Sequence, residues 1–258
     1  MKKLFSSFKR NGVIKTFDYI FLSVYINLYI IPKKFKNKTG LEIGGPSRFF
    51  SKGGICHIYP IVAKLDGVNF SETNIWTDKI DLTEGYIVDG KKLGNQFISD
   101  ATKLSGLPEN YYDFILSCNN IEHIANPLKA IERWLALLKS DGIILIVAPK
   151  KEANFDHNRK VVEFSHLISD YNNNILEDDL THLEEILLLH DLKLDPLAGN
   201  FEQFKQRSLD NFRNRCLHHH VFDMTVLSEI CNYFNLNIYF KHAFRNDYLI
   251  MATKKKTY

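Results

Sequence analysis

Short apolar runs alternate with helical periodicity along most of the chain. The pattern predicts seven strands, at residues 40–44, 64–70, 96–99, 113–117, 142–148, 236–242 and 248–253. Several of these runs are continuously apolar, as at 143–147, which is typical of strands that are covered on both faces. Strands that alternate with helices predict an α/β fold, in which helices lie on both faces of a Rossmann-like, mostly parallel seven-stranded sheet.

Two helices are clearly marked, one on each side of a long polar stretch. Asn126 and Pro127 supply an N-cap and a first-turn proline, and we expect this helix to end at Asp141-Gly142. Asp223 caps the second helix. Its apolar positions are Leu227, Ile230, Cys231 and Phe234. The last two predicted strands are separated by a short loop, so we expect an antiparallel C-terminal hairpin, where a dinucleotide-binding dehydrogenase would continue with crossovers.

Residues 150–222 interrupt the alternation of strands and helices. This stretch is polar, rich in His, Asp and Asn, and has helical segments near 179–190 and 201–211. It follows a strand of the parallel sheet, and loops at the carboxyl ends of such strands form the ligand crevice. We therefore predict an inserted, mainly helical lid. The expected division is an N-terminal helical segment at 1–38, a core domain at 39–149 and 223–258, and a lid at 150–222.

Charge is concentrated at the beginning of the chain. The first 38 residues carry nine Lys and Arg against the single acid Asp18, a net +8, which leaves −5 for the rest of a chain whose total is +3. An acidic body argues against binding of a nucleic acid polymer. The apolar run at 19–31 has only 13 residues and is too short to span a bilayer. We expect a helix that packs on its own domain or on the second subunit of a homodimer, or that touches a membrane peripherally at its inner face.

Cysteine usage suggests a reducing compartment. The four cysteines have no paired spacing, no C-x-x-C occurs, and no secretory signal precedes the domain. We expect reduced thiols and a cytoplasmic protein, and a zinc ribbon is not predicted.

A glycine turn follows the first predicted strand in the sequence Gly40-Leu-Glu-Ile-Gly-Gly-Pro-Ser47. Bare backbone at Gly44 and Gly45 permits close approach of a ligand, and Glu42 places an acid beside it that would complement a cation. The dinucleotide fingerprint G-x-G-x-x-G is absent, because no third glycine follows at the required spacing.

Four motifs in order resemble the class I S-adenosylmethionine (SAM)-dependent methyltransferases. They are the glycine turn at 41–47, Asp100-Ala101 after a short strand, the fourth strand with the Glu-His pair beyond it at 112–127, and the helix–glycine–strand segment at 137–147. Each motif alone is weak, but their combination is specific. The resemblance implies a SAM-binding enzyme of this fold.

The resemblance also implies the residues that hold the cofactor. They are Glu42, Gly44, Gly45 and Ser47 at the methionyl end, Asp100 and Ala101 at the adenine, and Cys118 and Asn119 at the sulfonium. The acid that usually binds the ribose is replaced by Asn69, which can both accept and donate hydrogen bonds. Asp66 in a shifted register is the alternative.

The composition of the predicted lid indicates which class of molecule accepts the methyl group. Its segments 155–159, 177–185 and 216–223 are dense in groups that bond hydroxyls or phosphates. This combination resembles methyltransferases of bacterial capsule and surface-glycan biosynthesis, which implies O-methylation of a sugar or nucleotide-linked sugar, such as a heptose. The residues expected to bind this small molecule are Arg159, His182, His218, His219 and His220. The alternatives are a quinone-like lipid, a phosphate-bearing capsule component, or SAM binding without catalysis.

Methyl transfer to a hydroxyl needs a nearby base, and histidine suits that role near neutral pH. His123 is the first candidate because it follows the fourth strand, beside the expected cofactor. A structural histidine bonded to a backbone carbonyl is the other interpretation of that position. His157 is the second candidate, with Asp156 and Arg159 to orient it or hold a phosphate.

The run His218-His219-His220 raises the question of a metal. Adjacent histidines point in different directions, and Asp178 with His182 offers a further pair on one helix face. We expect no metal, and predict instead that these residues cap helices and close the lid.

Overall fold

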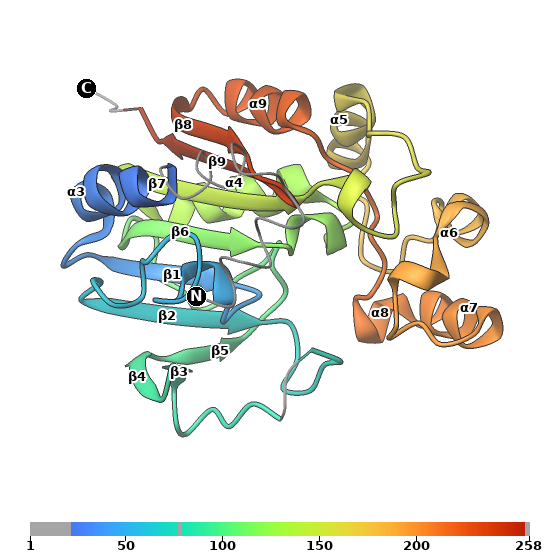
Figure 1. Ribbon diagram of the computed structural model, residues 1–258, viewed down its shortest axis with the longest axis horizontal. Coiled ribbons are helices and arrows are strands. Elements are labelled where there is room, and N and C mark those ends of the chain that lie inside the picture. The colour runs from blue at the N-terminus through green and yellow to red at the C-terminus, as the bar shows by residue number, and fades with distance from the viewer. Residues whose placement is uncertain (1–21, 77–78, 256–258) are drawn as a thin grey trace, which may run out of the picture.

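The computed structural model describes residues 22–76 and 79–255 (Figure 1). At its centre is a seven-stranded sheet with the order β5-β2-β1-β6-β7-β9-β8. Its strands are β1 (Thr39–Ile43), β2 (Lys64–Asn69), β5 (Gln96–Ile98), β6 (Tyr112–Cys118), β7 (Leu138–Pro149), β8 (Asn237–Ala243) and β9 (Asp247–Thr253). Strands β5, β2, β1, β6 and β7 are parallel, and β9 runs antiparallel to both β7 and β8. The predicted Rossmann-like sheet with its antiparallel C-terminal pair is confirmed.

Helices cover both faces of the sheet. The described helical elements are η1 (Ile26–Ile30), α3 (Ile31–Phe35), η2 (Arg48–Phe50), η3 (Ile121–His123), α4 (Pro127–Leu137), η4 (Lys151–Ala153), α5 (Phe164–Asn172), α6 (Leu183–Leu189), η5 (Leu192–Leu194), α7 (Phe201–Leu209), α8 (Asn211–Asn214) and α9 (Met224–Tyr233). Alternate residues of β7 enter different cores, with Ile144 and Ile146 on the face of α4, α5 and α9, and Leu145 and Val147 on the face of η1 and α3. This burial on both sides explains why the strand is continuously apolar.

The start of α4 is as predicted and its end is not. The Asn126 side chain accepts a hydrogen bond from the Lys129 amide at 3.1 Å, with Pro127 in the first turn. The predicted end at Asp141-Gly142 is wrong, because the helix stops at Leu137 and Leu138 already pairs with Tyr112 in the sheet. A register shift follows before Ile143 pairs with Phe114. Tertiary pairing therefore overrides the helical period here.

A small hairpin beside β2 is absent from the sequence prediction. It consists of β3 (Tyr86–Val88) and β4 (Lys91–Gly94), joined by Asp89-Gly90 with positive φ at both residues. Asp-Gly with this backbone is the usual signal of a tight hairpin turn. The hairpin carries the buried Tyr86 onto β2, where a Cβ on Gly67 would lie only 2.1 Å from the Tyr86 ring.

The N-terminal segment packs on the sheet where it is described. Ile26, Ile30, Ile31 and Phe35 are buried, and the Phe35 ring meets Phe114 edge-on at 5.0 Å. The rest of the predicted helical segment, residues 1–21, lies outside the described part of the chain. No helix among the residues described is long and apolar enough to cross a membrane.

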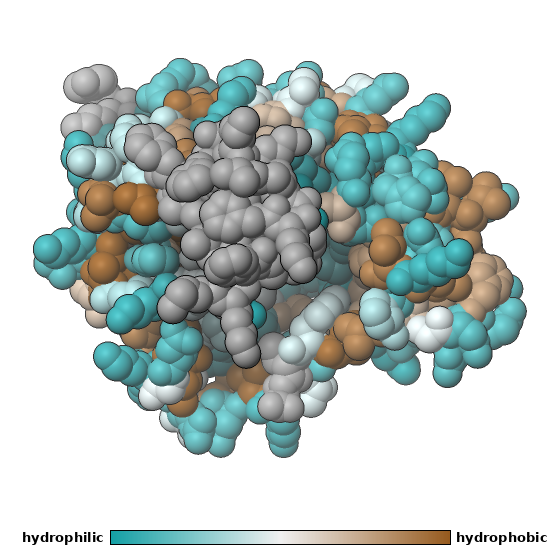
Figure 2. All heavy atoms as spheres, in the orientation of Figure 1, coloured by the Kyte–Doolittle hydropathy of each residue, from teal (hydrophilic) through white to brown (hydrophobic). Residues whose placement is uncertain are grey.

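The insertion has two parts. Helix α5 packs against α4 and α9, so its Leu167 belongs to the main core. Helices α6, α7 and α8 lie beyond the carboxyl ends of the strands, where α6 and α7 share a small core of their own around Phe204 (Figure 1). Leu188 and Phe212 are among the exposed apolar residues of this region, and brown patches appear there in Figure 2.

Candidate active site

A cavity of about 390 Å³ lies where the parallel strands end, against the inserted segment at 150–222 that we predict to be a lid. Residues from the ends of β1, β2, β6 and β7 line it, together with Asn154, Phe155, Asp195, Leu197, Arg207, Arg215, Cys216 and His218. Its volume falls within the range that small-molecule sites occupy, and its place at the carboxyl edge is where α/β sheets bind ligands.

The two glycines after β1 are bare for different reasons. Gly44 lines the cavity with φ +79°, and a Cβ there would lie 2.5 Å from Asn120 Oδ1. Gly45 does not line the cavity. A Cβ on Gly45 would lie 2.2 Å from the Tyr86 hydroxyl and 2.4 Å from Glu42 Cδ. Gly44 is therefore required by its left-handed backbone and by the Asn120 side chain, whereas Gly45 leaves room for Tyr86 and Glu42.

Glu42 is enclosed by hydrogen-bond donors of the protein. Tyr86 donates to its Oε2 at 2.7 Å, Tyr59 donates at 2.8 Å, and the Ser47 amide donates to Oε1 at 3.0 Å. Burial raises the pKa of Glu42 to about 7, although these three donors act in the opposite direction. Glu42 and Ser47 thus lie behind the glycine turn and do not line the cavity.

Asn69 occupies the cavity side of the β2 end. Its amide donates to the Gly45 carbonyl at 3.1 Å, and its oxygen accepts from Gln96 at 3.0 Å. The register pairs Asp66 with Leu41, well inside the sheet, and the Asp66 carboxylate accepts from the Tyr112 hydroxyl at 3.0 Å. Asn69 therefore reaches the ligand space and Asp66 does not.

Of the remaining residues predicted to bind the cofactor, some line the cavity and others do not. Ala101 and Asn119 line the cavity. The Asp100 carboxylate is turned to Thr102 and to Arg215 of the lid, which donates to it at 3.3 Å. Cys118 is buried beneath this surface.

Glu122, His123 and His218 converge on the cavity, with ligand atoms within 4.8 Å of one another. His123 Nδ1 lies 3.1 Å from the Leu217 carbonyl, and His218 Nδ1 lies 2.5 Å from Asp156 Oδ2. A carbonyl has no proton to give, so His123 Nδ1 is the donor and its Nε2 holds the free lone pair. No described group hydrogen-bonds to Glu122 Oε2. The three side chains form an acid–base set or a site for a divalent ion.

Burial sets the protonation of this group. It raises the pKa of Glu122 to about 7, and it lowers the pKa of His123 well below the usual value, with the neighbouring His218 adding to the effect. His123 is therefore neutral at physiological pH and can accept a proton.

The other predicted catalytic residues lie behind the cavity or on the lid surface. Arg159 is 2% exposed and donates to Asp156 at 3.1 Å and to the carbonyls of His218 and His219 at 2.7 and 3.0 Å. His157 lies 3.1 Å from Asp191 on the lid and does not line the cavity. Asp156 thus orients His218 rather than His157.

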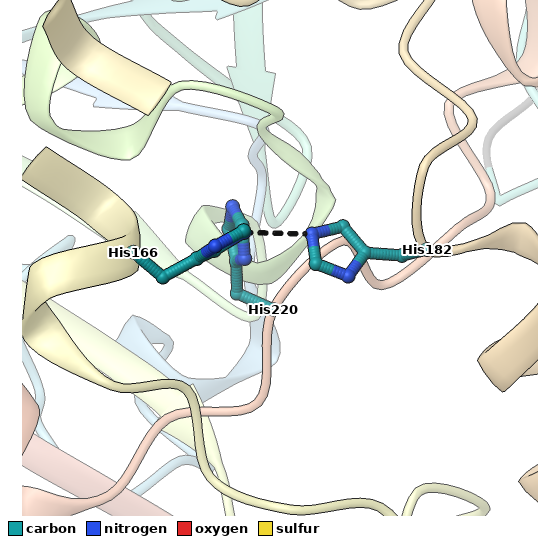
Figure 3. A group of neighbouring side chains, drawn as sticks. All are labelled: His166, His182 and His220. Atoms are coloured by element: carbon teal, nitrogen blue, oxygen red, sulfur yellow. Dashed lines mark hydrogen bonds between the residues drawn. The ribbon is translucent and has the colours of Figure 1, made fainter. Parts of the chain in front are cut away.

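The predicted acceptor residues are not brought together. Of the five, only His218 lines the cavity. His219 Nε2 is 3.0 Å from the Asn211 amide nitrogen, and His182 and His220 gather with His166 away from the cavity (Figure 3). Sequence reasoning had missed Glu122, Arg207 and Arg215 as cavity residues, although Glu122 stood next to the predicted base.

One family model matches part of the chain, and several solved structures are similar to it. Residues 60–146 match a family model described as a methyltransferase domain, from β2 through most of β7. Among curated proteins, none matches. Similar solved structures include a putative S-adenosylmethionine-dependent methyltransferase from Listeria monocytogenes (14% identity, 91% of this chain and 99% of that chain, TM-score 0.48) and a SAM-dependent methyltransferase from Methanosarcina mazei (15% identity, 90% and 100%, TM-score 0.48). The YcgJ protein from Bacillus subtilis is also similar (17% identity, 88% and 97%, TM-score 0.42).

The titration of Glu42 gives a test of the turn behind the cavity. Its pKa is about 7 in the folded chain against the usual 4.5, so folding favours the protonated form. The resulting stability is complete below pH 4.5 and is lost as the pH rises through 7. We expect this group to lower the free energy of unfolding by roughly 3 kcal/mol between pH 4.5 and 8.

Glu42→Gln removes this titration and should flatten that part of the stability curve. Urea unfolding of both proteins across this pH range measures the difference. Parallel curves would show that the carboxyl is not buried as described.

Proposed function

We propose that this chain, a methyltransferase with S-adenosylmethionine as its cofactor, methylates a hydroxyl of a sugar or nucleotide-linked sugar in surface-polysaccharide synthesis. The observation that carries the proposal is the convergence of Glu122, His123 and His218 on a cavity that Arg207 and Arg215 also line. An acceptor hydroxyl needs polar partners and a base, and both are present at this surface.

The cavity suits the cofactor. The bare turn at Gly44, the amide of Asn69 and the carboxylate of Glu122 offer close backbone approach, a hydrogen-bonding partner for a ribose and a negative charge for a sulfonium. When bound, SAM would supply the electrophilic methyl group, and its sulfur would keep the electron pair of the broken sulfur–methyl bond, which leaves S-adenosylhomocysteine.

The residues of the chain handle the proton. As the acceptor oxygen forms its bond to the methyl carbon, its proton passes to His123 Nε2. His123 Nδ1 keeps its own proton, held by the Leu217 carbonyl, so the ring becomes a cation. The carboxylate of Glu122 lies close enough to stabilise that charge. His218, oriented by Asp156, provides a second polar edge for the acceptor.

Arg207 supports a nucleotide-linked acceptor. It lines the cavity, and its NH2 group donates to Asp195 at 2.6 Å. Its Nε–H is buried with no hydrogen-bond partner among the described residues. A guanidinium donor in the wall of a ligand space favours an anionic group such as a phosphate. A quinone-like lipid would leave this donor unpaired, which makes the lipid the weaker alternative, while a phosphate-bearing capsule component remains compatible with it.

The N-terminal helix favours a peripheral membrane contact. Val24, Tyr25, Leu28 and Tyr29 are 45–62% exposed and form one stripe, opposite the buried Ile26 and Ile30. Lys33 and Lys34 follow within one turn. An apolar stripe flanked by basic residues suits an anionic membrane surface at the cytoplasmic face. A homodimer joined through the same stripe is the alternative.

His123→Gln should lower kcat by about 10²–10⁴-fold, because the amide cannot take the proton. Binding of S-adenosylhomocysteine, measured by titration calorimetry, should stay within a few-fold of wild type. The second predicted base provides the comparison. His157→Gln should keep nearly full activity, since the His157 ring faces Asp191. If His157→Gln loses activity and His123→Gln keeps it, His157 is the base.

A screen of sugars and nucleotide-linked sugars with SAM, read as the mass gain of one methyl group, tests the acceptor class. We expect a nucleotide-linked sugar to be methylated, and Arg207→Gln to raise its KM about tenfold or more while cofactor affinity is kept. Methylation of quinone precursors alone would overturn the proposal. If the protein does not bind S-adenosylhomocysteine, the proposed methyltransferase activity is wrong as well.

For the membrane contact, we expect the protein to co-sediment with vesicles of anionic lipid and the double variant Leu28→Asp, Tyr29→Asp to remain in the supernatant. Size-exclusion chromatography serves as the control. A shift from dimer to monomer in the variant, without vesicle binding by wild type, would assign the stripe to a homodimer.

A further inference from the structure

Three histidines outside the cavity form a compact group (Figure 3). His166 comes from α5, His182 from the residue before α6, and His220 from the extended return segment at 216–223 that leads to α9. Their rings point toward one another, and one ligand nitrogen from each lies within 4.8 Å of the others.

The spacing of the rings matches that of ligands around one ion. The centroid of His166 is 5.0 Å from that of His182 and 5.7 Å from that of His220, and His182 and His220 are 5.2 Å apart. Imidazoles at tetrahedral angles with Zn–N bonds near 2.0–2.1 Å place their centroids about 5 Å apart. The nitrogens of His166 and His182 are 3.1 Å apart, about the edge of such a tetrahedron.

Two buried atoms beside the group lack partners among the described residues. His220 Nε2 lies 3.2 Å from the Ala125 carbonyl and must donate to it, which leaves the lone pair of Nδ1 buried and unpaired. A histidine that gives one N–H to a carbonyl and keeps the other nitrogen free is arranged as metal ligands usually are. Asp170 Oδ2 is also without a hydrogen bond, although it lies 3.4 Å from His166 Nε2 and 3.3 Å from His220 Nε2.

We propose that His166, His182 and His220 bind one Zn²⁺ ion, with the Asp170 carboxylate beside them to balance its charge. Three imidazoles form a ligand set that suits zinc rather than magnesium or calcium, which prefer oxygen ligands. Such a cation satisfies the orphaned Nδ1 of His220, and its charge complements the nearby carboxylate of Asp170. It also accounts for the close approach of His166 and His182.

The zinc site joins three parts of the fold. Helix α5 belongs to the main core through Leu167, whereas His182 begins the lid helix α6. His220 lies two residues after His218, which lines the cavity. Zinc at this point therefore cross-links the lid and the return segment to the body. It thereby stabilises the part of the lid that lines the cavity. It acts as a structural ion and takes no part in methyl transfer.

The test uses the full chain without a histidine tag, stripped of metal with a chelator and titrated with zinc chloride alone. We expect one Zn²⁺ per chain by calorimetry and elemental analysis. At a free zinc concentration 100-fold above Kd, Tm should rise by roughly 5–10 °C. Cobalt in place of zinc should give the visible absorption of a tetrahedral Co²⁺ centre.

Single variants separate this site from other histidines. His182→Ala and the more exposed His166→Asn should each weaken zinc binding by about 100-fold or more, and His242→Asn, on β8, should bind zinc like wild type. If His182→Ala does not fold, zinc binding by His166→Asn and the cobalt spectrum of wild type still test whether the ion lies at this site. The proposal is overturned if wild type binds no zinc in excess metal. It is equally overturned if His123→Ala abolishes binding while His182→Ala does not, because the ion then lies in the cavity.

Discussion

The buried guanidinium of Arg159 is the contact on which the lid and the site both depend. It donates to two consecutive backbone carbonyls, those of His218 and His219, and to the carboxylate of Asp156. Because the group is 2% exposed, loss of its partners would leave an uncompensated charge in the interior, at a cost of about 3–5 kcal/mol. The return segment is thereby fixed against the start of the predicted lid, and the His219 amide joins it to the body by donating to the Glu122 carbonyl at 2.8 Å.

With the return segment held in this way, its three adjacent histidines lie in three different environments. His218 faces the cavity, His219 packs against Asn211, and His220 joins His166 and His182. In an extended chain successive side chains point to opposite sides, which separates His219 from both neighbours. The advance of the chain by two residues then carries His220 from the cavity to the His166 and His182 group. The proposed methyl-transfer site and the proposed zinc site are therefore linked through only two residues of backbone.

Local signals in the sequence were enough to predict the sheet and the start of α4. The strand pattern depends on burial on both faces, and the Asn126-Pro127 cap acts within one turn, so neither needs knowledge of distant residues. The position of His123 was also predictable, because a residue that follows a parallel strand lies at its carboxyl edge. The Asp89-Gly90 turn was a readable signal that the prediction overlooked.

Other features depend on contacts between residues far apart in sequence. Glu42 was expected at the ligand, but hydroxyls from Tyr59 and Tyr86, 17 and 44 residues away, enclose it. The end of α4 was set by pairing of Leu138 with Tyr112, which no helical period can reveal. In the same way, His166 and His220 lie 54 positions apart in the printed sequence, and only the folded lid brings them together.

The position of β9 between β7 and β8 has a consequence for biosynthesis. Strand β7 has β6 on one side and β9 on the other. Its residue Pro149 pairs with Asp247 of β9, which follows about a hundred residues later in the chain. At ~5–20 residues per second, a ribosome needs on the order of 5–20 s to supply that partner. Throughout this interval the growing polypeptide exposes an apolar strand edge that invites aggregation. A chaperone that shields nascent β7 would therefore matter more to the yield of this enzyme than to its final stability.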